Sequence, residues 1–267
     1  MIRSFWIFLA DIFRDRNLLW GLGKNDLKSR FAASFLGSAW AIVQPLVTIL
    51  VFWFVFQAGF RNPPRSGVPF IIWFAPAYLS WCFFSEALSS GTNSLMEYSY
   101  LVKKVKFRVS TVPLVKILSS MFIHTGFIVF IFFMLIVSGV PLSIYNIQVF
   151  YYFFCTCVLL VGLCWCLSAI APFVKDTVNI VNVFLQIGFW ITPIFWSPDE
   201  MTVWVQMLLK LNPMFYICRG YRDSFVDHVW FWQRGNTNLF FWVVTVAVFF
   251  FGANLFHKLR PQFADVL

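Results

Sequence analysis

Residues 24–46 read KNDLKSRFAASFLGSAWAIVQPL, and the chain loses its charge within this stretch. The first part carries two lysines, an aspartate and Arg30, whereas no charged residue occurs from 31 to 60. A basic segment that leads into a long uncharged run is typical of the passage from water into a first transmembrane helix. We therefore expect residues 1–33 to lie at the membrane surface and residues 36–60 to span it.

The composition indicates an integral membrane protein. The chain is 60% hydrophobic and 12% charged, against about 25% charged residues in soluble domains. The net charge of +9 comes from residues that flank apolar runs and not from one solvated face, so membrane orientation explains it better than nucleic-acid binding. Most of the six cysteines fall within apolar runs, and we expect neither a disulfide nor a metal site.

Further apolar runs complete an all-α pattern of six transmembrane helices. After the first run they cover residues 69–88 (ending near Glu86), 112–138, 149–171, 180–196 and 239–256. Pro45 predicts a kink or an early break near Gln44, and Pro193 breaks the fifth span. Residues 5–13 place their apolar side chains on one helical face, which predicts an amphipathic helix lying on the membrane.

The insert at residues 197–238 carries two short helical patterns separated by Asn212 and Pro213, and both are too short to span the membrane. We treat residues 1–267 as one permease domain with a six-span bundle at 36–256. Lys and Arg are more frequent before the first span, after the second and at the C-terminus than in the remaining loops. The positive-inside rule therefore predicts that both termini are cytoplasmic.

Catalytic signatures are not evident in the sequence. GLGK at 21–24 fails as a phosphate-binding loop, because Leu18 stands where its first glycine should be and Asn25 follows the lysine. The three histidines are too far apart for a zinc motif. Glu86 is the one acidic residue expected within a span, so ion-coupled transport has little support.

Four stretches carry a resemblance to a known family, in that family's order along the chain. They are residues 26–46, YLVKKVKF at 100–107, ITPIFWSPDEM at 191–201 and LNPMFYICRGYRDSF at 211–225. Together they resemble the ABC-2 type permeases that export bacterial cell-surface polysaccharides such as O-antigen, capsule and teichoic acid. One departure is Val109 in KFRVSTVP, where a proline is expected in the family.

The resemblance implies a homodimer in the bacterial inner membrane that works with two copies of a separate cytoplasmic ABC ATPase. ATP and magnesium would bind to that partner, and this chain would bind no cofactor of its own. The two short helices of the insert would be re-entrant at the outer mouth. The segment that would dock on the ATPase contains Glu97, Tyr100, Lys103, Lys104 and Lys106; a positive-inside anchor is the alternative for its lysines.

The cargo that the resemblance implies is a lipid-linked glycan with a phosphate-containing linkage. Aromatic rings suit the apolar faces of sugars, so the candidate channel lining is Trp40, Trp53, Trp190 and Trp196, with packing against lipid or helices as the alternative. Candidate phosphate contacts are Lys28, Arg30, Arg219 and Arg222, and the alternative is that these side chains are anchors or face water. On one continuous helix, Trp40 would lie about 15 Å deeper than Arg30.

Three other functions stay open at this stage. An ABC-2 permease for drugs or simple lipids would share the fold. A membrane enzyme acting on polyprenyl-phosphate sugars would need clustered carboxylates or histidines, which the sequence does not offer. A stand-alone ion-coupled carrier is the weakest of the three.

Overall fold

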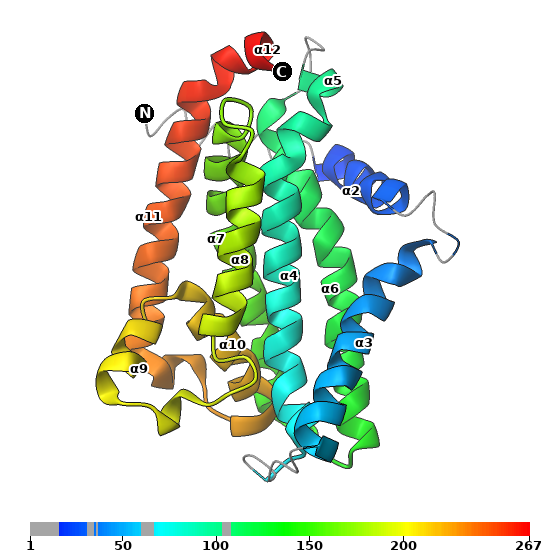
Figure 1. The fold of residues 1–267 in the computed structure, drawn as a ribbon, viewed down its shortest axis with the longest axis vertical. Coiled ribbons are helices and arrows are strands. Elements are labelled where there is room, and N and C mark those ends of the chain that lie inside the picture. The colour runs from blue at the N-terminus through cyan, green and yellow to red at the C-terminus, as the bar shows by residue number, and fades with distance from the viewer. Residues whose placement is uncertain (1–15, 31–34, 36, 60–66, 103–107) are drawn as a thin grey trace.

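The computed structural model describes residues 16–30, 35, 37–59, 67–102 and 108–267, and these residues form an all-helical bundle (Figure 1). Two predicted features lie outside the described residues. One is the amphipathic helix at residues 5–13, and the other is the group of lysines Lys103, Lys104 and Lys106.

Within the described residues, five helical segments are long and apolar enough to cross a membrane. They are built on α3 (Trp40–Trp53) with the π-helical η2 (Phe54–Gly59), α4 (Phe70–Glu97), α6 (Val112–Val137), α7 (Val149–Ile170) and α11 (Gly235–Leu259). The fifth predicted span, residues 180–196, corresponds to α8 (Thr177–Ile191), which has 15 residues. At about 1.5 Å per residue this helix is about 22 Å long, less than the hydrocarbon thickness of about 30 Å.

The end of α8 follows from Pro193. The residue before a proline avoids helical geometry, and Thr192 is extended, with φ −72° and ψ 132°. The fifth span is thus shorter than predicted, and the chain after it enters the insert.

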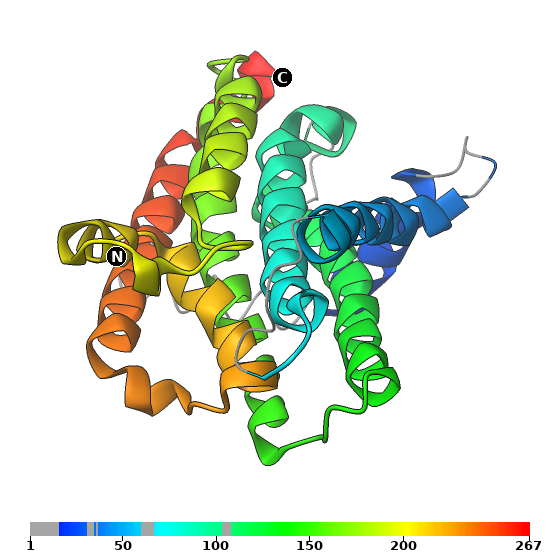
Figure 2. The same cartoon turned by 60° about the horizontal axis from the view of Figure 1, so that its bottom comes forward.

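The two ends of the bundle carry different elements (Figure 1). Helix α2 (Arg16–Arg30) lies across the bundle at the same end as α5 (Ser99–Val102) and the C-terminal α12 (Phe263–Val266). The insert helices α9 (Val203–Leu209) and α10 (Pro213–Arg222) lie in the opposite half, and the tilted view of Figure 2 separates them from α2.

Helix α4 forms the centre of the bundle. It packs against α3, α6, α7, α8 and α10 and is the most buried of the candidate spans. Beside it, α7 and α11 approach closely at a pair of glycines. A Cβ atom on Gly252 would lie 2.1 Å from the carbonyl oxygen of Gly162, so the contact between these backbones requires glycine. Small residues at helix crossings are the usual route to tight packing in membranes.

Helix α4 continues past Glu86, where the second span is predicted to end, and reaches Glu97. The structure supplies the reason: Glu86 is paired with Arg30 of α2, so its charge does not require the helix to leave the bundle. The break predicted near Gln44 is also not observed, since α3 continues through Pro45. Pro45 lies near the start of α3, where the loss of one backbone hydrogen bond is tolerated.

Helix α10 of the insert begins at Asn212 and Pro213, the residues that separate the two helical patterns in the sequence. The Asn212 side chain accepts a hydrogen bond from the Met214 N–H at 3.0 Å, and Pro213 occupies the first turn, as expected for an N-cap followed by proline. Helix α9 has only 7 residues, or about two turns. After α10 the chain makes a π-helical turn, η6 (Asp223–Asp227).

Candidate functional site

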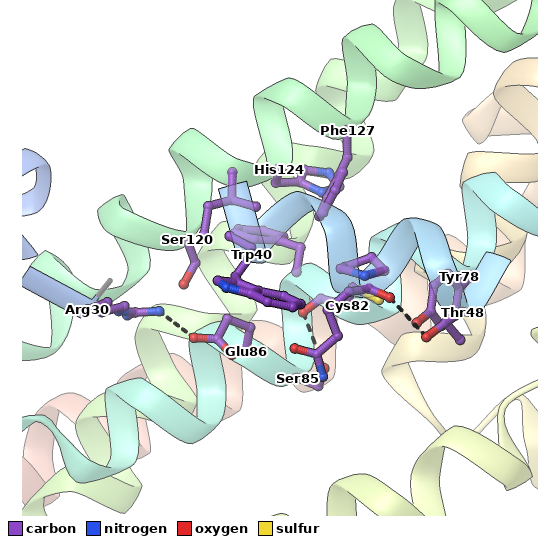
Figure 3. A pocket seen from close by; sticks show the side chains of 15 residues that line it. Arg30, Trp40, Thr48, Tyr78, Cys82, Ser85, Glu86, Ser120, His124 and Phe127 are labelled. Carbon is purple, nitrogen blue, oxygen red and sulfur yellow. Dashed lines mark hydrogen bonds and ion pairs between the residues drawn. The ribbon is translucent and has the colours of Figure 1, made fainter. Parts of the chain in front are cut away.

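A cavity of about 510 Å³ lies between α3, α4 and α6, with the end of α2 at one side (Figure 3). Helix α3 contributes Trp40, Ala41, Gln44, Pro45 and Thr48; α4 contributes Tyr78, Cys82, Phe83, Ser85 and Glu86; α6 contributes Ser120, Ile123, His124 and Phe127; and α2 contributes Arg30. We call it the α3–α4–α6 cavity. Its walls combine aromatic rings with polar groups, as binding sites for small organic groups generally do.

An ion pair closes one side of this cavity. Arg30, the last residue of α2, donates a hydrogen bond from Nη1 to the Glu86 carboxylate of α4 (Figure 3). Its Nε donates to the Asp26 carboxylate one turn earlier at 3.1 Å. The remaining nitrogen, Nη2, is buried and has no hydrogen-bond partner among the described residues. Arg30 therefore keeps one donor for a further acceptor at the cavity.

The ion pair continues into a buried network that joins α2 to α4 and α6. The Lys116 ammonium of α6 donates to the Asp26 carboxylate at 2.6 Å and to the Glu97 carboxylate at 2.6 Å. Asp26 and Lys116 are each 1% exposed, and Tyr98 adds a hydrogen bond to Asp26 at 2.7 Å. A buried charge is tolerated only when it is paired and hydrogen-bonded, so these contacts hold α2 against the bundle.

The ionisation of Asp26 reflects the same contacts. Burial alone would raise the pKa of this carboxyl group. The hydrogen bonds from Lys116 and Tyr98 and the charges of Lys116 and Arg30 outweigh burial and hold the pKa below its ordinary value of 3.8. Asp26 is therefore a carboxylate that positions Arg30 and Lys116.

His124 contributes a second unsatisfied group to the cavity wall. The ring is fully buried, stacks on Phe83 with centroids 4.6 Å apart, and shares a hydrogen bond of 2.6 Å between Nε2 and the Tyr221 hydroxyl group of α10. Its Nδ1 has no partner among the described residues, and neither does the hydroxyl group of Ser120. Since buried polar groups are normally hydrogen-bonded, these two atoms fit a polar ligand or water in the cavity.

The four tryptophans predicted for the substrate path occupy different places. Trp40 lines the cavity, and its side chain is 45% exposed. Trp53 and Trp190, 39% and 58% exposed, line neither this cavity nor the second one described below. Trp196 is partly buried, and its Nε1 donates to the Trp190 carbonyl oxygen at 3.2 Å. The structure thus brings only Trp40 together with Arg30.

The spatial relation predicted between Arg30 and Trp40 is also different. They do not lie on one helix, because α2 ends at Arg30 and α3 begins at Trp40. Both side chains line the same cavity instead. Lys28 is exposed and lies outside the cavity lining.

The two arginines predicted at the insert have separate environments. Arg219 is partly buried and lines a second, polar cavity of about 520 Å³ between α9, α10 and the start of α11. Arg222 is 4% exposed, and its guanidinium group lies 3.6 Å from the Trp73 ring centroid. It donates to the carbonyl oxygens of Trp73 at 3.2 Å, Pro193 at 2.6 Å and Ile194. Arg222 therefore does not face water, which was the alternative to a phosphate contact.

Of the residues predicted to contact an ATPase, the structure describes Glu97 and Tyr100, which lie at the α2 end of the bundle (Figure 1). The Glu97 side chain is 46% exposed although it pairs with Lys116. Tyr100, in α5, is 57% exposed and packs near Tyr98, with centroids 6.1 Å apart.

Sequence reasoning did not identify the aromatic cluster beside the cavity. Phe74 lies between Tyr78 and Phe70 on α4, with ring centroids at 5.3 and 5.6 Å, and Phe52 of α3 packs on it at 5.0 Å. This cluster extends from Tyr78, at the cavity wall, toward the insert end of α4. A phenylalanine in an apolar run gives no signal that separates packing from a lining role.

A metal centre is not formed by the part of the chain that the structure describes, where no group of three or more His, Cys, Asp or Glu side chains could hold an ion.

Comparison with known proteins agrees with this architecture. The family model described as ABC-2 type transporter matches residues 17–226. The chain is 25% identical to the O-antigen export system permease protein RfbA of Klebsiella pneumoniae, over 94% of this chain and 95% of that protein. It is 24% identical to the O-antigen export system permease protein RfbA of Myxococcus xanthus, over 96% of this chain and 98% of that protein.

Proposed function

The chain belongs to the ABC-2 type transporter family, and we propose that it is the membrane subunit of an ATP-driven exporter of lipid-linked polysaccharide in the bacterial inner membrane. Family membership makes the chain a transporter and not the polyprenyl-phosphate enzyme considered above. The polysaccharide cargo is supported by the printed function of its relatives, which match nearly the whole chain.

The observation that carries the proposal is the set of groups at the α3–α4–α6 cavity. The Arg30 Nη2, which has no partner among the residues that the structure describes, suits a phosphate oxygen, because charge-assisted hydrogen bonds to phosphate are strong. The Trp40 ring offers a flat surface for the apolar face of a sugar. His124 and Ser120 supply unsatisfied polar atoms for sugar hydroxyl groups. One cavity therefore combines the chemistry of a glycan with that of its phosphate linkage.

The partner is a cytoplasmic ABC ATPase, as the family implies. We propose two ATPase copies on a homodimer of this chain. The docking surface is the segment that includes Glu97 and Tyr100 together with Lys103, Lys104 and Lys106, and the exposure of Tyr100 supports that role. ATP and magnesium belong to the partner, and the membrane subunit needs no cofactor.

The proposed topology has six crossings, with α8 as the short fifth one and with α9 and α10 re-entrant. Helix α2 and the C-terminal α12 share one end of the bundle (Figure 1). That end also carries Lys24, Lys28, Lys258 and Arg260, so the positive-inside rule supports cytoplasmic termini.

The test compares, in the native host, the two tryptophans at the first and last positions of α3, which are similarly exposed. Trp40→Ala removes a cavity ring, whereas Trp53→Ala removes a similarly exposed ring outside the cavity. Deletion of the gene should leave glycan chains in the cytoplasm. Loss of about 0.5–1.5 kcal/mol of stacking energy corresponds to a reduction of about two- to tenfold in export. We expect this reduction for Trp40→Ala and little change for Trp53→Ala, at equal protein levels in the membrane.

A second matched pair tests the phosphate contact. Arg30→Gln should slow export, while Lys28→Gln, two residues earlier and exposed, should leave the rate unchanged. Normal surface glycan in the deletion strain would overturn the proposed function. Normal export by Trp40→Ala and Arg30→Gln would instead favour the alternative cargo, a drug or a simple lipid.

A further inference from the structure

The second cavity lies at the opposite end of the bundle from α2 and shares no lining residue with the α3–α4–α6 cavity. It has a volume of about 520 Å³ and is enclosed by α9, α10, η6, the 3₁₀ turn η7 (Phe231–Arg234) and the first turn of α11. We call it the insert cavity. In the proposed topology it opens on the outer side of the membrane.

An ion pair between Asp223 and Arg234 lines the insert cavity. Asp223 is 1% exposed. Arg234 donates two hydrogen bonds to its carboxylate in a bidentate manner, from Nε at 2.8 Å and from Nη2 at 2.6 Å. A bidentate arginine–carboxylate pair fixes both side chains in one plane. The Arg234 guanidinium group therefore neutralises Asp223, and no further cation is needed to balance the charge of this carboxylate.

Two further cations line the cavity without such a partner. Lys210 follows α9 and is exposed, and Arg219 of α10 is partly buried. Neither forms an ion pair with another residue in the described part of the chain. The remaining carboxylate of the lining is Asp199, which accepts a hydrogen bond from Ser197 at 3.0 Å. The lining therefore keeps a net positive charge.

The other polar groups of the lining are amides, a phenol and the hydroxyl group of Thr237. Gln206, Gln233, Asn236 and Tyr216 border the cavity. Amide side chains donate and accept hydrogen bonds at once, which suits the hydroxyl groups of a polyol. A site with cations beside amides can recognise a phosphate ester of a hydroxylated alcohol, because the cations bind the phosphate and the amides bind the hydroxyl groups.

We propose that the insert cavity binds the phosphate ester of a sugar or polyol, with Lys210 and Arg219 on the phosphate and the amides on hydroxyl groups. Two sources carry this chemistry: the phosphate of a saccharide, and the headgroup of an anionic phospholipid such as phosphatidylglycerol. The inference goes beyond the proposed function, since it does not depend on which cargo the α3–α4–α6 cavity accepts.

The experiment measures equilibrium binding of small probes to the purified full-length chain without ATP or the ATPase, so its outcome is separate from export. Glucose 1-phosphate should bind, inorganic phosphate should bind more weakly, and glucose should show no saturable binding. Arg219→Gln and Lys210→Gln should each weaken the binding of glucose 1-phosphate about tenfold or more, because a hydrogen bond to a charged group contributes about 1.5–3 kcal/mol.

Lys258→Gln is the matched control, since Lys258 is exposed at the far end of α11; it should leave the affinity unchanged. Unchanged affinity in both Arg219→Gln and Lys210→Gln, or equally tight binding of glucose, would overturn the proposal. Nanodiscs distinguish the two sources. Weaker binding of glucose 1-phosphate in phosphatidylglycerol than in phosphatidylcholine nanodiscs would identify the lipid headgroup as a ligand, and equal binding would identify the saccharide phosphate.

Discussion

Replacement of Lys116 by methionine tests whether the buried network holds α2 on the bundle. Methionine keeps much of the length of the side chain and removes its charge. Asp26 then loses a contact of 2.6 Å and keeps Arg30 at 3.1 Å and Tyr98 at 2.7 Å. Glu97 also loses Lys116, but it is 46% exposed, so water replaces most of that contact.

The magnitude follows from the burial of Asp26. Removal of one partner from a fully buried pair costs about 3–5 kcal/mol. Because Asp26 retains two of its three partners, we expect Lys116→Met to lower the free energy of unfolding by about 2–3 kcal/mol. For a chain of this size that corresponds to a decrease in melting temperature of about 5–10 °C.

A double-mutant cycle in detergent isolates the charge. In Asp26→Asn/Lys116→Met no unpaired buried charge remains, the Tyr98 hydroxyl group still has an acceptor, and Arg30 still has Glu86. We expect the double variant to be more stable than Lys116→Met alone. Lys258→Met, at an exposed lysine, is the matched control and should melt like the wild type. Wild-type stability of Lys116→Met, or additive losses in the double variant, would refute a structural role for the pair.

Two further predictions concern Asp26 and Arg222. The lowered pKa of Asp26 means that its ionised form stabilises the fold above its ordinary pKa of 3.8, and that this contribution is lost as the pH falls through the lower folded value. The difference in melting temperature between wild type and Asp26→Asn should thus persist down to about pH 4 and shrink below it; a constant difference across this range would contradict the assignment. Arg222→Gln should lower the free energy of unfolding by about 3 kcal/mol or more, because several buried carbonyl oxygens lose a charged donor, and Arg222→Lys should not restore it, since lysine lacks the planar fork. Arg219→Gln, at a partly exposed arginine of the same helix, should melt like the wild type, and equal losses in both would indicate a general defect of α10.

The helices could be predicted from the sequence because their signals are local. Long apolar runs identified the five long spans, and Asn212 with Pro213 marked the start of α10. These features depend on neighbours within a turn or two, where residue type and spacing are sufficient. The continuation of α4 past Glu86 could not be predicted for the opposite reason, because the partner of Glu86 lies 56 residues earlier in the sequence.

The candidate site could be predicted only in part, for a similar reason. Arg30 and Trp40 were identified by residue type next to the uncharged run, and the structure places both in one cavity. The role of His124 could not be predicted from the sequence, because its partner Tyr221 is 97 residues away. In the sequence, Lys116 is a basic residue near the start of an apolar run, whereas in the structure it is buried between two carboxylates. A charge in or beside an apolar run has the same appearance in sequence whether it faces lipid headgroups or a buried partner.

Arg222 and Pro193 show how two separate sequence signals belong to one structural unit. Proline ends α8 early and leaves the carbonyl oxygens at its C-terminal side without helical donors. The guanidinium group of Arg222, 28 and 29 residues later, donates to the Ile194 and Pro193 oxygens and lies over the Trp73 ring. The break in the helix creates acceptors that would be costly to bury, and the arginine satisfies them. Each signal taken alone suggests a disruption or a solvated charge, whereas together they fix the insert to α4.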